Sequence, residues 1–171
     1  MPDGARHKYA ETLAFRPVRP LADAAMLTSF GRDLYVESLG RDHEFRRDYG
    51  ARGQKFPLWV AACAAADPDY AALLTENGEA IGLVVLGGGA RNEAVGHVHH
   101  FYVVPSHRGR GFGGLLDDYA RATLRSAGYM RARLNVTATN DRAIRFYLAQ
   151  GWEKMRERSG AGRLVNMEVA L

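Results

Sequence analysis

The segment between Val95 and Tyr147 constrains the fold of this chain more than any other part of its sequence. A run rich in β-branched and aromatic residues ends at Pro105, and the glycine-rich stretch Arg108–Gly114 then leads directly into an apolar helical pattern. A turn of this kind leaves backbone N–H groups unpaired at the positive end of the helix dipole, and glycine has no Cβ to keep an anion away. We therefore predict an anion-binding turn at Arg108–Gly114, called the glycine turn below, with room for a pyrophosphate.

Length, charge and cysteine content set the broad class of protein. With 171 residues the chain suits one domain, which we expect over residues 12–171, after a loose segment over residues 1–11. The net charge of +4 is too small to indicate a nucleic-acid partner, but it is compatible with an anionic ligand. The single cysteine, Cys63, excludes an intramolecular disulfide and a metal site built from several cysteines.

No segment of the sequence has the pattern of a membrane anchor. The longest apolar run, Leu58–Ala66, is about half as long as a bilayer span requires. The N-terminus lacks the apolar segment of a secretory signal. We therefore expect a soluble, cytoplasmic protein with no membrane partner.

Before the glycine turn, the apolar pattern predicts an edge strand, a group of helices and a hairpin. In chain order these are a strand over Leu13–Val18, two short helices within Leu21–Tyr49 that Gly31 and Gly40 interrupt, a helix over Pro57–Ala66, and strands over Tyr70–Thr75 and Ala80–Leu86 joined by a turn at Asn77-Gly78. A loop is expected from Gly87 to Glu93, before the strand that leads to the turn.

From Val95 onward, the pattern predicts a strand–helix–strand crossover with parallel strands. Its parts are a strand over Val95–Val104, a helix that ends at Gly128, and a strand over Arg131–Thr137. A further helix, capped by Asn140 and closed at Gly151, precedes an antiparallel pair over Trp152–Glu157 and Leu164–Ala170. We find no internal repeat and no second domain.

Two phosphate-binding motifs of other folds do not fit. Gly109, Gly111 and Gly114 satisfy the letters G-x-G-x-x-G, but a dinucleotide-binding fold also needs an acidic residue about 20 residues later to hold a ribose. Leu134–Thr137 offers none. A P-loop is excluded because no Gly-Lys-Ser/Thr follows the glycines.

The arrangement instead resembles the GNAT superfamily of acyl-CoA-dependent N-acyltransferases. Two linked motifs carry the resemblance, which covers about Phe15 to Ala170 and is specific over Val103–Tyr147. The family's Arg/Gln-x-x-Gly-x-Gly/Ala is met by Arg108, Gly111 and Gly113, and its Asn-x-x-Ala-x-x-x-Tyr helix by Asn140, Ala143 and Tyr147.

The resemblance implies a mixed α/β fold, with a six- to seven-stranded, mostly antiparallel sheet whose central parallel pair is splayed, flanked by helices. It implies an enzyme that moves the acetyl group of acetyl-CoA to a primary amine, with acetyl-CoA as co-substrate and no metal. Dimers are frequent in that family, so a homodimer is an open alternative.

The resemblance also assigns site residues. Phe101, Tyr102 and Val103 would offer backbone groups to the pantetheine, which Asn140 would also contact, and Tyr147 would protonate the departing thiolate. The pyrophosphate would be held by Arg108, Gly109, Arg110, Gly111, Phe112, Gly113 and Gly114. From the residues alone, Asn140 can equally be a simple helix cap, Tyr147 a core aromatic, and the two arginines solvated charges.

Three histidines lie on the strand before the turn. Strand alternation predicts that His97 and His99 share a face with Phe101 and Val103, and that His100 points the other way. The arylalkylamine acetyltransferases are similar in having His-x-His here, and imidazole titrates near physiological pH. We expect His99, then His97, to accept the proton of the amine, with Glu168 in reserve. A water chain is the alternative base, and a metal site is disfavoured because neighbours on a strand diverge.

The acceptor is expected to be a small-molecule amine that attacks acetyl-CoA directly in a ternary complex. Acidic and aromatic side chains within Tyr35–Leu58 could attract and wall a cationic amine, namely Asp42, Glu44, Asp48, Tyr35, Phe45, Tyr49 and Phe56, with Trp59 just beyond. The alternatives are a protein or peptide N-acetyltransferase and a non-catalytic CoA-binding sensor or interaction module.

Overall fold

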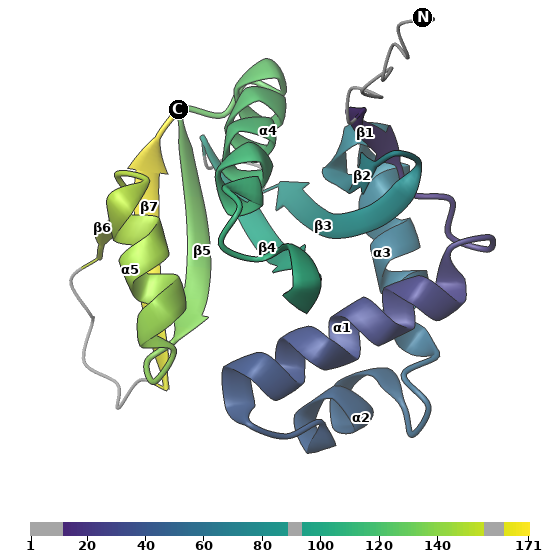
Figure 1. Ribbon diagram of the computed structural model, residues 1–171. Helices are drawn as coiled ribbons and strands as arrows, with labels where there is room; N and C mark the ends of the chain where they lie inside the picture. The colour runs from purple at the N-terminus through teal and green to yellow at the C-terminus, as the bar shows by residue number, and fades with distance from the viewer. Residues whose placement is uncertain (1–11, 89–93, 156–162) are drawn as a thin grey trace, which may run out of the picture.

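In the computed structural model, which describes residues 12–88, 94–155 and 163–171, seven strands form one mixed sheet (Figure 1). The strands are β1 (Leu13–Pro17), β2 (Ala71–Glu76), β3 (Glu79–Gly88), β4 (Val95–Val103), β5 (Arg131–Thr137), β6 (Glu153–Lys154) and β7 (Leu164–Ala170). The helices are α1 (Ala24–Leu39), α2 (His43–Tyr49), α3 (Lys55–Ala66), α4 (Phe112–Ser126) and α5 (Asp141–Ala149), with 3₁₀ turns at Pro68–Tyr70 and Pro105–His107. The predicted mixed α/β sheet flanked by helices is confirmed.

The order of strands in the sheet is β1-β2-β3-β4-β5-β7-β6. Among the described strands, every neighbouring pair is antiparallel except β4 and β5. These two pair only between Val95–His97 and Arg131–Arg133, and then they diverge (Figure 1). The splayed parallel pair and the crossover through α4 are therefore confirmed.

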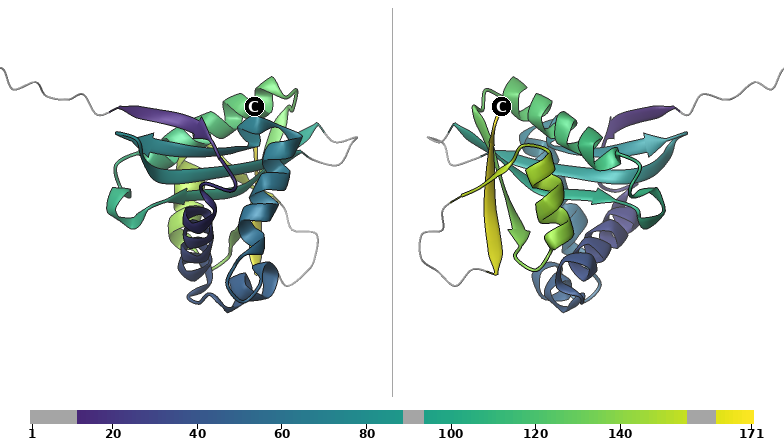
Figure 2. Two further views of the ribbon diagram at one scale, coloured as in Figure 1. Left: turned by 90° about the vertical axis from the view of Figure 1, so that its right-hand side faces the viewer. Right: turned by 60° about the vertical axis from the view of Figure 1, so that its left-hand side comes forward.

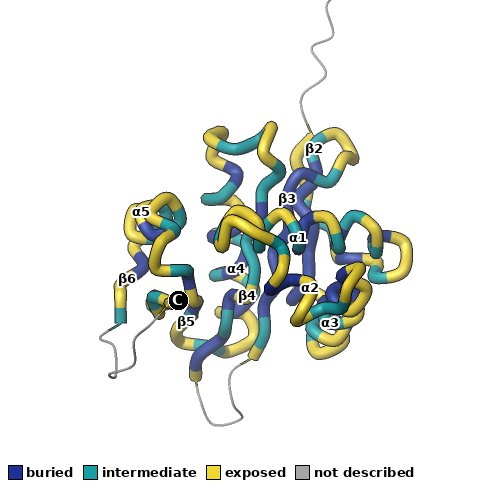
Figure 3. Tube along the Cα trace, turned by 90° about the horizontal axis from the view of Figure 1, so that it is seen from below, coloured by how far each residue is buried: buried dark blue, intermediate teal, exposed yellow. Residues whose placement is uncertain are grey.

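Each face of the sheet carries its own hydrophobic cluster, because the two faces are covered by different helices (Figure 2). Helices α4 and α5 pack on one face, where Leu116, Leu124 and Trp152 are buried. Helices α1 to α3 pack on the other, where Phe45 and Phe56 are buried. The residues of the central strands are mostly buried, whereas the outer sides of the helices are exposed (Figure 3). No helix in the described ranges is both long and apolar enough to cross a bilayer.

The predicted helix break at Gly31 is wrong. Gly31 lies inside α1, where a Cβ would stand 2.8 Å from the ring of Phe56 and 2.9 Å from that of Phe45. This glycine lets the helix approach the aromatic cluster closely and does not end it. The break at Gly40 is confirmed, because Gly40 is left-handed (φ 74°) and its N–H donates to the Val36 carbonyl at 2.7 Å.

The hairpin and the last strand pair follow the predictions in outline. Asn77 and Gly78 both have positive φ, 53° and 86°, as a type I′ turn requires. Of the loop expected at Gly87–Glu93, the first two residues extend β3, and residues 89–93 lie outside the described ranges. Of the strand expected over Trp152–Glu157, β6 contains Glu153 and Lys154 and pairs with β7 in the expected antiparallel sense, and residues 156 and 157 lie outside the described ranges.

Candidate active site

A cavity of about 460 Å³ opens beside the point where β4 and β5 part. Its wall combines the end of β4, the glycine turn, the first turn of α4, the inner side of α5 and the last turns of α1. The predicted site residues that line it are Phe101, Tyr102, Val103, Arg108, Gly109, Gly111, Phe112, Gly113, Gly114, Asn140 and Tyr147. The structure thus brings together most of the residues that the two motifs single out.

The glycine turn has the backbone geometry of an anion site. Gly109 (φ 76°) and Gly111 (φ 86°) are left-handed, and neither would meet an atom within 4 Å at its Cβ position. Gly111 is the N-cap of α4, so the first N–H groups of that helix have no intrahelical acceptor. A Cβ on Gly113 would stand 3.1 Å from Phe146, which explains how α4 and α5 come close together. The turn can hold phosphate oxygens through backbone N–H groups and the helix dipole.

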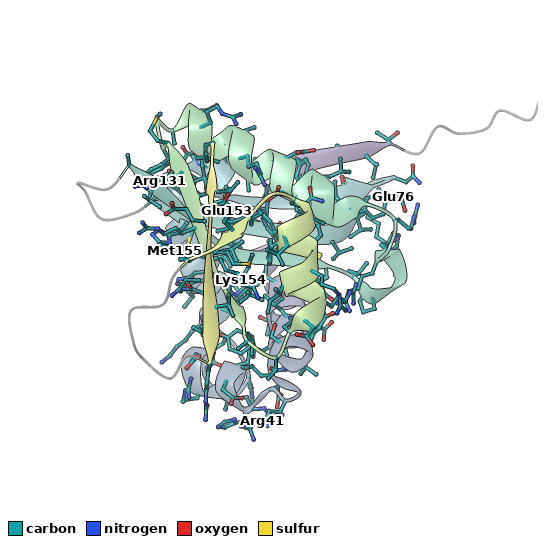
Figure 4. All side chains as sticks on the ribbon, turned by 90° about the vertical axis from the view of Figure 1, so that its left-hand side faces the viewer. Arg41, Glu76, Arg131, Glu153, Lys154 and Met155 are labelled. Atoms are coloured by element: carbon teal, nitrogen blue, oxygen red, sulfur yellow. The ribbon has the colours of Figure 1, made fainter. Side chains whose placement is uncertain are left out.

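The two arginines of the turn have different surroundings. Arg108 belongs to the cavity wall: its Nε donates to the Val103 carbonyl at 2.8 Å, and its guanidinium lies 5.7 Å from the centre of the Tyr102 ring. Arg110 instead pairs at 2.8 Å with Glu76, which is labelled in Figure 4, and lies over the ring of Phe112. The structure therefore does not bring Arg110 into the cavity.

Asn140 and Tyr147 come from the same helix. The Asn140 side chain caps α5 by accepting a hydrogen bond from the Ala143 N–H at 3.1 Å. The Tyr147 ring packs between Phe101 and Trp152, with centroid distances of 6.1 and 5.8 Å. Burial raises the pKa of Tyr147 well above its usual value, and the nearby charge of Asp117 raises it further. The phenol is therefore protonated at neutral pH and can act as a proton donor.

Asp117 is a buried carboxylate that we did not single out from the sequence. It is 1% exposed and accepts hydrogen bonds from Trp152 Nε1 at 2.8 Å and from Arg121 Nε at 2.7 Å. Arg121 also donates to the Gln150 carbonyl at 2.6 Å, at the end of α5. This network joins α4 to the end of α5 and so supports the helix that carries Tyr147. The sequence offers one sign of this role: Asp117 directly follows Leu116, within the apolar stripe of the predicted helix.

The prediction that His97 and His99 share a face is confirmed, because their rings stack, but the predicted relation of that face to Phe101, Val103 and His100 is wrong because β4 contains a β-bulge. Val85 pairs with His100 and Leu86 with Val98, so His99 is an extra residue. The bulge reverses the alternation, and all three histidines lie on the face covered by α3, opposite Phe101 and Val103. None of them lines the described cavity.

The extra residue needs space on the neighbouring strand. The His99 ring lies over Gly87 of β3, where a Cβ would stand 2.4 Å from His99 Nε2. The same ring contacts Trp59 with a centroid distance of 5.5 Å and stacks on His97 at 6.2 Å. Partial burial lowers the pKa of His99, and the charge of His97 lowers it further.

His100 is enclosed by aromatic rings. The rings of Trp59, Phe56 and Tyr35 have their centroids 5.1, 5.4 and 6.5 Å from the imidazole, and the buried Nε2 has no hydrogen-bond partner within the described residues. Burial lowers the pKa of His100 to about 4. His100 is therefore neutral over the physiological range and belongs to the packing under α3.

Glu168, the expected reserve base, is held by two arginines of β5. Glu168 accepts from Arg133 at 2.7 Å and pairs with Arg131 at 3.4 Å, so both of its carboxylate oxygens are engaged. A carboxylate held in this way is poorly placed to take a proton from an amine.

The part of the chain that the structure describes contains no group of three or more histidine, cysteine or acidic side chains that could hold a metal ion.

Comparisons with known proteins agree with this geometry. The sequence model of the acetyltransferase (GNAT) family matches residues 32–152. Among solved structures, PaiA N-acetyltransferase from Thermoplasma acidophilum, in complex with coenzyme A, has a TM-score of 0.76 and 17% identity over 94% of this chain and 99% of that chain. YncA from Salmonella typhimurium, with its cofactor acetyl-CoA, has a TM-score of 0.67 and 19% identity over 93% and 94%. Arabidopsis thaliana Naa50, with the bisubstrate analogue CoA-Ac-MVNAL, has 0.65 and 18% over 93% and 99%.

These solved structures share the fold with this chain. No curated protein matches the sequence.

Replacing Asp117 by alanine should lower the free energy of unfolding by about 3 kcal/mol, because the Trp152 N–H and the Arg121 guanidinium lose a buried partner. Urea unfolding at pH 7 measures the change. The neighbouring exposed Asp118 is the matched control, and Asp118→Ala should change stability by less than about 0.5 kcal/mol. Equal effects of the two substitutions would contradict the role given to the network.

His100 should make folding sensitive to mild acid. Because the folded state holds His100 neutral, the unfolded state binds the proton first as the pH falls, and stability is lost from about pH 6.5 down to about pH 4. Between pH 7.5 and pH 5 the parent protein should lose about 2 kcal/mol more than His100→Phe. Urea unfolding of both proteins at the two pH values tests this, and identical losses would show that His100 is not kept neutral.

Proposed function

Because this chain belongs to the acetyltransferase (GNAT) family, we propose that it moves the acetyl group of acetyl-CoA to the primary amine of a small molecule. The observation that carries the proposal is that one cavity, beside the splayed strands, is lined by both the glycine turn and the half-buried phenol of Tyr147. One end of this cavity suits a pyrophosphate, and the other offers a proton to a leaving group.

The acyl donor would bind along the cavity wall. The N–H groups at the start of α4 and the guanidinium of Arg108 are placed to hold phosphate oxygens. The end of β4 has no strand partner on the β5 side beyond His97, and the Val103 carbonyl there accepts from Arg108. The other backbone groups of Phe101–Val103 on that side are available to amide groups of a pantetheine arm. In structures of similar fold, PaiA N-acetyltransferase holds coenzyme A and YncA holds acetyl-CoA.

The proposed mechanism has two proton transfers, one on each face of the sheet. The amine would approach from the α3 face, where His97 is the last residue of β4 that pairs with β5 and its ring stacks on His99. These imidazoles would accept the proton that the amine loses, and Tyr147, from the opposite face, would give a proton to the sulfur of the departing thiolate. Direct attack is the simpler route, since Cys63 is a half-buried thiol on α3 whose pKa burial raises.

The nature of the acceptor rests on the α3 face. Tyr35, Tyr49 and Trp59 are half-buried beside the histidines and could contact an apolar or aromatic amine. The acidic residues of α2 offer less attraction to a cation than their number suggests, because arginines pair with Asp42, Glu44 and Asp48. A peptide N-terminus is the second candidate, since Naa50 of similar fold binds CoA-Ac-MVNAL.

Thiol release from acetyl-CoA at mildly alkaline pH tests the proposal, against arylalkylamines, polyamines, aminoglycosides, amino acids and peptide N-termini. Saturable release with one class of small amine supports it, and release with peptides alone favours the second candidate. If acetyl-CoA raises the melting temperature of the protein but no acceptor leads to thiol release, the protein is a CoA-binding sensor instead. An acetylated enzyme seen by mass spectrometry without acceptor would contradict direct attack.

Tyr147→Phe should lower kcat about 100-fold and leave the KM for acetyl-CoA within about threefold, because it removes a proton donor and keeps the ring. Steady-state kinetics measures both constants. Tyr119→Phe is the control, because the Tyr119 hydroxyl donates to the Asp69 carbonyl and Tyr119 does not line the cavity. An unchanged kcat in Tyr147→Phe would remove the phenol from the mechanism.

The double variant His97→Asn, His99→Asn should flatten the rise of kcat/KM with pH, because asparagine keeps a polar side chain but does not titrate between pH 5 and 9. A pH–rate profile from pH 6 to 9 is the measurement, with circular dichroism to verify folding. The same profile in parent and double variant would mean that solvent, not the histidines, takes the proton.

A further inference from the structure

Glu37 in the last turn of α1 joins three elements across the mouth of the cavity. Its carboxylate pairs with Arg108 of the glycine turn at 2.6 Å and with Arg142 in the first turn of α5 at 3.2 Å. All three side chains line the same cavity. A phosphate could take the place of the carboxylate between these two guanidinium groups, because it accepts hydrogen bonds from arginine in the same way.

We propose that Arg108 and Arg142 form a phosphate subsite for the acyl donor, that Glu37 occupies this subsite before the donor binds, and that the phosphate displaces it and releases the last turn of α1. This inference rests on the proposed function, because it requires a donor that carries phosphate. It assigns Arg142 to the donor site and makes Glu37 an internal competitor of the donor.

Arg108 is held in place more firmly than Glu37. Its Nε bonds to the Val103 carbonyl, it lies over the ring of Tyr102, and its side chain is 21% exposed. Tyr102 is itself anchored, because its hydroxyl donates to Asp33 at 2.9 Å. Glu37 is 32% exposed and has only the two arginines as charged partners in the described structure. The carboxylate is therefore the partner that moves.

A phosphate has the advantage in this competition. The pyrophosphate of the donor as a whole carries more charge and more acceptor oxygens than one carboxylate, and it can reach the N–H groups at the start of α4 as well as the guanidinium groups. Arg142 is 63% exposed, so solvent screens its pair with Glu37 and most of the competition takes place at Arg108.

Displacement of Glu37 would change the aromatic contacts at the same end of α1. Tyr35, on the same end of α1, packs on Phe45 and Tyr49 with centroid distances of 5.4 and 6.0 Å, and its ring lies 6.5 Å from that of His100. The aromatic surface beside the proposed acceptor path therefore depends on the position of the last turn of α1. Donor binding would come first, and the movement of this turn would change the position of Tyr35 on that surface.

Calorimetric titration with coenzyme A tests the competition without turnover. Glu37→Gln should bind coenzyme A about two- to fivefold more tightly, because the competing charge is lost, and Arg142→Gln should bind it more weakly. Glu79→Gln makes the same charge change at an exposed hairpin position and should bind like the parent. Weaker or unchanged binding by Glu37→Gln overturns the inference. A parent protein that does not bind coenzyme A at all overturns the proposed donor as well.

Hydrogen exchange tests the release. Coenzyme A should speed exchange of the backbone amides over residues 34–39 in the parent protein, and this increase should be absent in Glu37→Gln. An ordinary contact between donor and α1 would slow exchange at the same amides. Slower exchange in the parent therefore contradicts release.

Discussion

The short parallel pairing of β4 and β5 is the constraint on which the rest of this structure depends. Three residues of each strand are paired, and beyond His97 the two strands separate. Separation leaves backbone groups without a sheet partner, a situation that a protein tolerates where a ligand or solvent can satisfy them. It also creates a passage between two faces with different helices, different clusters and, in our proposal, different reactants.

The two sides of this passage are stabilised by different means. On the side of α4 and α5, a buried ionic network around Asp117 connects α4 to Trp152 and to the end of α5, so Tyr147 stands on a supported helix. On the side of α1 to α3, aromatic rings surround His100, and the exposed Arg46 and Arg47 of α2 pair with Asp42 and Asp48. The first arrangement suits a group that must keep one position and one protonation state. The second suits a surface that adapts to an acceptor.

The sequence predicts most of the fold and the donor side of the site, because these depend on local signals. Glycines with positive φ, a helix cap at Asn140 and the Asn77-Gly78 turn can be recognised from a few neighbouring residues. The errors have non-local causes. Gly31 is required by the rings of another helix, and the face of the histidines depends on how β4 pairs with β3. Arg110 has the sequence context of a ligand-binding residue, but Glu76, from a distant hairpin, draws it away.

The bulge at His99 links two positions that lie on different strands. The imidazole occupies the volume above Gly87 that a side chain on β3 would otherwise take. Even alanine at position 87 would meet the end of this ring, so the imidazole would have to turn away from β3. Its contacts with Trp59 and His97 would then change as well. The orientation of one imidazole on β4 is thus coupled to the size of the residue on the neighbouring strand.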